Sequence, residues 1–150
     1  TPTAIPNLFM ISGAQDELGI ANLKQMHKAK ILSQFSELPV DYVLLDLGAG
    51  TTFNTIDFFI AADQGIITTL PEPTSIENSY RFIKTVYQRK LKMSEELLEI
   101  GPLMDEALNS KISQNSTPAD FVNKVIEINP ELGHKLKVEI ERLQPRLIIN

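Results

Sequence analysis

The feature that most constrains this chain is an apolar segment that ends on an acid and opens into glycines: DYVLLDLGAGTTFN, residues 41–54. Residues 42–46 are too uniformly hydrophobic for a strand with one solvated face, so they predict a strand buried on both faces of a parallel sheet. Asp46 would end this strand. Gly48 and Gly50 would then form a loop in which the backbone can approach a ligand closely. We therefore expect an α/β fold with a candidate site at the end of this strand.

Strand and helix signals alternate along the chain, as in a βαβ protein. Further strands are predicted at residues 7–11, 65–70 and 146–150, which gives a parallel sheet of about four strands flanked by helices. Helices are predicted over residues 23–37, over 55–62 and from about residue 74. Their predicted caps are Asn22, Asn54 with Asp57, and Thr74 with Glu77. Arg89, Lys90 and Lys92 favour the negative C-terminal end of the third helix.

Residues 94–143 have a different pattern, with helix-start signals and no strand signal. The starts are Ser94 before two glutamates, Thr117–Pro118 with Asp120, and Asn129–Pro130. A later stripe, made of Leu132, Leu136, Ile140 and Leu143, has helical spacing. We expect one domain over residues 1–150 that carries a helical insertion at 94–143. The insertion is either simply packed helices or a surface on which a protein partner docks.

Composition excludes several classes of function. The net charge of −5 and the pI of about 5.0 argue against direct binding of nucleic acid or an anionic membrane. The chain has no cysteine, which excludes disulfides and thiolate chemistry and suits a cytoplasmic location. No apolar run approaches the roughly 20 residues that a membrane span requires.

The strand–acid–glycine turn at residues 42–50 is compatible with more than one class of protein. A methyltransferase has a similar cofactor loop; its third glycine would be Thr52 here, and Glu72 could be its ribose-binding acid. A phospho-receiver domain is set aside because residues 7–13 offer no acid and residues 67–73 offer no lysine. In a P-loop nucleoside triphosphatase, the strand-end Asp orders Mg²⁺ through water, and a glycine four residues later offers its backbone N–H to the γ-phosphate.

Residues 41–84 resemble the centre of a MinD/ParA-type P-loop ATPase. The matching features after the Asp46 strand are the Ala62–Asp63 pair, the Pro71–Glu72 pair at the end of a strand, and the Thr74–Ser75 helix start. The final PRLIIN resembles the following strand of that family, and NLFMISGAQ (7–15) resembles the strand before the Asp46 strand. The resemblance covers about two thirds of the chain.

The resemblance implies a nucleotide site and its ligands, ATP and Mg²⁺. Asp46 would order the metal through water, and Gly48, Ala49 and Gly50 would form the loop that meets the γ-phosphate. Pro71 and Glu72 would line the loop near the nucleotide, and Asn150 would lie on the adenine side. The parent protein would be a homodimerising ATPase used in cell division, chromosome or plasmid partitioning, or polar positioning. A methyltransferase-like domain and a non-catalytic interaction module stay open as alternatives.

The chain departs from the family in two ways. Gly48 replaces the usual proline of the loop, and none of the seven glycines is followed by lysine, so the glycine-rich phosphate cradle is absent. The cradle would precede Thr1, and both ends of the chain look cut, so we expect a middle-to-late fragment that is inactive alone. In the family, other strands separate residues 7–11, 42–46 and 65–70, whereas 65–70 and 147–150 are neighbours. Without those strands, we expect 42–46 to pair directly with 65–70, or a second copy to fill the gaps.

Each of these residues could also have a purely structural role with no ligand. Asp46 could cap a turn, and Gly48 and Gly50 could serve only the turn. Glu72 could be a first-turn helix acid, and Asn150 could have no partner.

Overall fold

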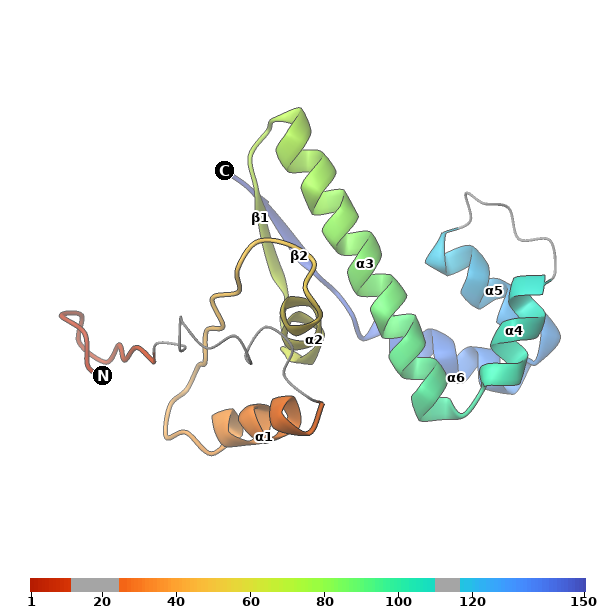
Figure 1. Cartoon of the computed structure of the whole chain (residues 1–150), viewed down its shortest axis with the longest axis horizontal. Coiled ribbons are helices and arrows are strands. Elements are labelled where there is room, and N and C mark those ends of the chain that lie inside the picture. Colours follow the sequence, from red (N-terminus) through yellow and green to blue (C-terminus); the bar gives the residue numbers. More distant parts are fainter. Residues whose placement is uncertain (12–24, 110–116) are drawn as a thin grey trace. The chain divides into compact units, whose positions relative to one another are not determined.

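The structure is a computed structural model that describes residues 1–11, 25–109 and 117–150. The chain forms two compact units, Thr1–Val43 and Leu44–Asn150, which are described separately below (Figure 1). The predicted helix cap Asn22 and the first residues of its helix lie outside the described residues.

The first unit contains the helix α1 (Gln25–Ser36), which agrees with the predicted helix over its described part. The predicted strand at residues 7–11 is wrong. The N-terminal residues instead fold back on themselves, with an isolated antiparallel bridge between Pro2 and Phe9. The Met10 N–H donates to the Thr1 carbonyl at 2.8 Å. This local turn-back satisfies the backbone without a sheet.

The second unit contains a small sheet and most of the helices. Its elements in chain order are α2 (Phe53–Ala61), β1 (Ile66–Thr69), α3 (Pro73–Leu98), α4 (Gly101–Asn109), α5 (Pro118–Ile128), α6 (Pro130–Glu141) and β2 (Arg146–Ile149). Strands β1 and β2 are parallel, with Ile66 opposite Arg146 and Thr69 opposite Ile149. They are the expected neighbours, the segments 65–70 and 147–150.

A small core holds α2 and α3 against this strand pair. It consists of the buried side chains of Ile56, Phe59, Ile67 and Val86. The Phe59 and Phe82 rings meet edge-on, with their centroids 5.0 Å apart. We name this part, residues 44–86 with β2, the sheet region.

Residues 42–48 form no strand, which differs from the prediction. The side chain of Leu44 is 92% exposed, so this segment is not buried on two faces. The expected pairing with residues 65–70 does not form, since β1 pairs with β2 alone among the described strands. A strand needs a hydrogen-bonded neighbour, and this apolar segment has none among the described residues. The sheet of about four strands therefore stays a prediction.

Helix α3 is one continuous helix of 26 residues, so the predicted new start at Ser94 is wrong. Ser94 lies inside α3 and is only 1% exposed, because its small side chain fits where α3 packs against its neighbours. The predicted Thr74–Glu77 cap does not form: Glu72 is the N-cap residue and makes no side-chain cap bond. Glu99, in a left-handed conformation, ends the helix instead of the basic residues near 90.

The helices α4, α5 and α6 share a second core with the end of α3, which we name the helical region (residues 98–141). Its buried members are Ile100, Met104, Ala107, Phe121, Val122, Val125, Leu136 and Ile140. The predicted helix starts at Thr117 and Asn129 are confirmed. Thr117 and Asp120 form a reciprocal capping box, and the Asn129 side chain accepts from the Leu132 N–H. The described residues of 94–143 contain no strand.

Candidate functional site

The candidate loop at residues 46–50 is open and accessible. The Asp46 side chain is exposed and makes no ion pair or hydrogen bond with the described residues. Gly50 has a φ of +112°, a conformation that other residues rarely adopt, and apart from its chain neighbours no atom of the described residues lies within 4 Å of a Cβ placed there. The same space is open at Gly48. Backbone N–H groups here can therefore be approached by a ligand.

The loop leads directly into helix α2, whose start is held in place by a side-chain cap and by an ion pair with α3. The Thr52 side chain caps the helix by accepting from the Thr55 N–H at 3.3 Å. The predicted cap by Asn54 with Asp57 is wrong. Asp57 is buried and forms an ion pair with Arg89 of α3, with Arg89 Nε 2.8 Å from Asp57 Oδ1. The Arg89 guanidinium also lies 5.8 Å from the centre of the Phe53 ring.

Sequence reasoning missed this Asp57–Arg89 pair. Its hydrogen bond to Asp57 raises the pKa of Arg89, so the guanidinium stays charged. The available signal was an acid in the otherwise apolar helix FNTIDFFIA, since a charge on such a helix needs a partner. The identity of that partner, 32 residues away, had no signal in the sequence.

The carboxyl ends of β1 and β2 bring other predicted site residues together. The Asn150 N–H donates to the Thr69 carbonyl at 3.0 Å, which places Asn150 beside the end of β1. Pro71 and Glu72 follow β1 at the same edge and are exposed. In open α/β sheets, ligands bind outside the carboxyl ends of parallel strands. The structure thus gathers Pro71, Glu72 and Asn150 at the edge where a nucleotide would be expected.

Ser75 holds the connection between β1 and α3 in shape. Its hydroxyl accepts from the Leu70 N–H at 3.0 Å and lies 2.9 Å from the Thr69 hydroxyl. No hydrogen bond or ion pair links this edge to residues 46–50 within the described parts of the chain. The predicted site residues therefore form two groups, the 46–50 loop and the 71–72/150 edge.

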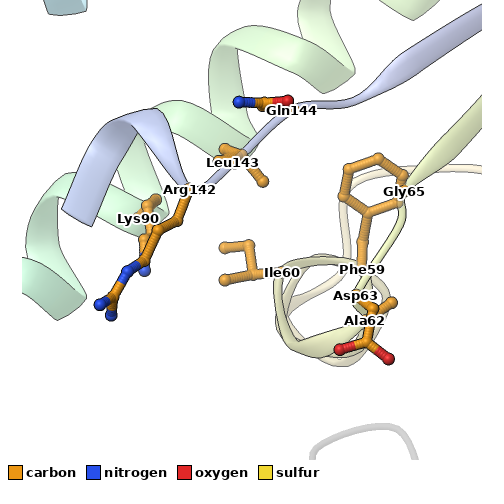
Figure 2. A pocket seen from close by; sticks show the side chains of 9 residues that line it. All are labelled: Phe59, Ile60, Ala62, Asp63, Gly65, Lys90, Arg142, Leu143 and Gln144. Atoms are coloured by element: carbon orange, nitrogen blue, oxygen red, sulfur yellow. The ribbon is translucent and has the colours of Figure 1, made fainter. Parts of the chain in front are cut away.

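The described cavities lie away from both groups. One, of about 50 Å³, is lined by Phe59, Ile60, Ala62, Asp63, Gly65, Lys90, Arg142, Leu143 and Gln144 (Figure 2). Ligand sites for molecules of nucleotide size are typically about 300–1,000 Å³, so this one is too small. The second is an open groove of about 330 Å³, lined by Leu98, His134, Lys135, Val138 and Glu139. No candidate nucleotide residue lines either of them.

Clusters of metal-ligating side chains and membrane-spanning helices are both absent from the described residues, 1–11, 25–109 and 117–150. No group of three or more His, Cys, Asp or Glu side chains is placed there to hold a metal ion. Asp46 is a lone acid, which fits a carboxylate that acts on Mg²⁺ through water better than a closed protein cage. Within the described residues, none of the helices combines the length and hydrophobicity that crossing a membrane would take.

Comparison with known proteins gives one partial likeness. The chain is 34% identical over 84 residues to the flagellum site-determining protein YlxH of Helicobacter pylori. The match covers 53% of this chain and 28% of that protein, so the chain spans well under half the length of its relative. No family model matches the chain, and no solved structure matches it. The likeness to YlxH is consistent with the resemblance of residues 41–84 to the MinD/ParA family.

Proposed function

We propose that this chain is part of a MinD/ParA-like switch that binds and hydrolyses ATP and dimerises in its ATP-bound state. The likeness to a flagellum site-determining protein carries most of this proposal. The positions of Pro71, Glu72 and Asn150 at one edge of a parallel strand pair support it, because that edge is where this class binds nucleotide. The cellular task that fits best is positioning a structure such as a flagellum.

The residues of this chain fit the part of a nucleotide site that contacts Mg²⁺ and the γ-phosphate. The exposed Asp46 carboxylate is available to hold water around Mg²⁺, and the open backbone at Gly48, Ala49 and Gly50 is available to donate to phosphate. The metal ion would neutralise charge on the phosphates. The glycine-rich cradle that binds the phosphates would come from another part of the full-length protein, so we expect no catalysis from residues 1–150 alone.

A methyltransferase-like domain is the alternative that the DLGAG loop itself favours. In that case Glu72 would hold the cofactor ribose, and the preferred ligand would be S-adenosylmethionine. The positions of Pro71, Glu72 and Asn150 do not separate the two alternatives, but their ligands do.

The experiment is a measurement of ATP turnover by the full-length protein and two variants. Asp46→Asn removes the charge that orders the metal's water while leaving an exposed side chain of the same size, so we expect turnover to fall by about 100-fold or more. Asp41→Asn is the matched control: it removes an exposed acid five residues earlier, and we expect normal turnover. Normal turnover by Asp46→Asn would reduce Asp46 to a turn residue and contradict the proposal.

A further inference from the structure

Two adjacent residues of α3 tie this helix to different parts of the second unit. Arg89 holds the first turn of α2 through Asp57 and Phe53. Lys90 pairs with Glu139 of α6 at 3.3 Å, and both of these side chains are largely buried, at 17% and 13% exposed. Successive residues of an α-helix point about 100° apart, which is why neighbours in sequence reach different elements.

From these contacts we propose that α3 couples the 46–50 loop to the helical region, so that nucleotide bound at the loop changes the stability of α6. This coupling rests on the proposed function, and it would let the bound nucleotide regulate the helical region. The path has three contacts: the loop enters α2 at the Thr52 cap, α2 meets Arg89, and Lys90 meets α6.

The loop side of this path is built so that a loop movement reaches α2. Only Ala49–Gly50–Thr51 and the cap residue Thr52 separate Gly48 from Phe53, the first residue of α2. Phe53 and Asp57 are four residues apart and lie on one face of α2, and both contact the Arg89 guanidinium. A ligand that draws the Gly50 backbone toward itself therefore pulls on the turn that Arg89 holds.

The α6 side of the path is equally well connected. Glu139 accepts from Lys90 of α3 and from Arg142, the residue that ends α6, at 3.3 and 2.6 Å, so one carboxylate contacts both α3 and the end of α6. The Tyr87 hydroxyl donates to the Leu143 carbonyl at 3.3 Å, just beyond α6. Leu143 also packs against the core of the sheet region. Residues 86–90 of α3 thus contact both cores, and α3 is an uninterrupted helix through this point.

Figure 2 shows how close the two parts come at this point. Lys90, Arg142 and Leu143 lie on one side of the small cavity, and Ile60, Phe59, Ala62 and Asp63 from the end of α2 and the following turn lie on the other. The cavity between them is small, about 50 Å³, so the end of α2 and the end of α6 lie close to each other here. Among the contacts at this point, we assign the transmission to the two ion pairs, Asp57–Arg89 and Lys90–Glu139.

The test is amide hydrogen exchange on the full-length protein, with Mg²⁺ and a non-hydrolysable ATP analogue and without nucleotide. In the native protein we expect the exchange of both the 46–52 loop and α6 to change, α6 by about fivefold, at the lower end of typical coupling between sites. Arg89→Met and Lys90→Met each break one contact and should keep the loop response but lose the α6 response. Arg81→Met is the matched control, since Arg81 lies on the same helix in an exposed pair with Glu77; both responses should stay.

The outcomes separate this inference from the proposed function. An α6 response that survives in both Arg89→Met and Lys90→Met would overturn the coupling, and so would a native protein whose loop responds while α6 does not. A loop that fails to respond in the native protein would overturn the proposed function, and the coupling would fall with it. If circular dichroism shows that Arg89→Met is unfolded, Lys90→Met alone decides.

Discussion

The sheet region and the helical region are stabilised in different ways. The helical region buries a continuous set of side chains, with Ala107, Val125 and Leu136 fully buried. In the sheet region, β2 has no buried residue, and its Ile149 is 66% exposed. Helices satisfy their backbone hydrogen bonds internally, whereas a strand needs a neighbour and leaves unpaired N–H and C=O groups at an open edge. From this contrast we expect the helical region to contribute more to the free energy of unfolding than the sheet region.

The largest effect should come from the helical core. Leu136→Ala removes a fully buried side chain, so we expect a loss of about 2–5 kcal/mol in the free energy of unfolding, measured by chemical denaturation. Ile149→Ala, on the exposed face of β2, is the counterpart in the sheet region and should cost less than about 1 kcal/mol. If Ile149→Ala costs as much as Leu136→Ala in the full-length protein, β2 is covered there and the contrast between the regions is broken.

A second effect tests how closely α5 and α6 approach each other. A Cβ at Gly133 would lie 2.5 Å from the Ile126 Cα, which is backbone and cannot move aside easily. Gly133→Ala should therefore destabilise the protein by about 1–3 kcal/mol. Gly101→Ala is the control, because the nearest atom to its Cβ is the end of the Glu95 side chain at 3.6 Å. A neutral Gly133→Ala would mean that the two helices pack less closely than described.

A smaller effect should follow from removing the cap of α5. Thr117→Ala deletes the hydroxyl that accepts from the Asp120 N–H, so we expect a loss of about 0.5–2 kcal/mol. Thermal unfolding followed by circular dichroism measures it. The same substitution at Thr52, the cap of α2 in the sheet region, allows a direct comparison. A larger loss at Thr52 would show that the sheet region contributes more to overall stability than its exposed strands indicate.

The smallest effect should be a pH dependence of the α5 cap. Hydrogen bonds from the Thr117 backbone N–H, and then from its hydroxyl, lower the pKa of Asp120. The folded pKa lies below the unfolded value, so this stabilisation is complete above about pH 4 and is lost as the pH falls through the folded pKa. The stability gap between the native protein and Asp120→Asn should therefore narrow on acidification. A gap that stays constant with pH would contradict the role of the charge.

What could be predicted from the sequence followed from local signals. The starts of α5 and α6 were predictable because Thr117 with Asp120, and Asn129 with Pro130, act within one turn. The continuation of α3 through Ser94 was not, because it depends on packing between helices. The apolar residues 42–46 read as a strand, but a strand also requires a partner that the sequence of the segment does not contain.

For the candidate site, too, the sequence predicted the residues that lie in local motifs and missed a contact between distant helices. Asp46, Gly50, Pro71, Glu72 and Asn150 were found from motif order, and their roles stay predictions. The parallel pairing of β1 and β2, which brings Asn150 to the end of β1, agrees with the expected neighbours. The Asp57–Arg89 pair was missed because it joins two helices that only the fold brings together.

The most direct test of the central claim is a binding titration of the full-length protein by calorimetry, with ATP and with S-adenosylmethionine, each with and without Mg²⁺. We expect the protein to bind ATP in a way that depends on Mg²⁺ and weakens in Asp46→Asn, and we expect no heat of binding from S-adenosylmethionine. Binding of S-adenosylmethionine without any response to ATP would contradict the account and identify the DLGAG loop as a methyltransferase loop.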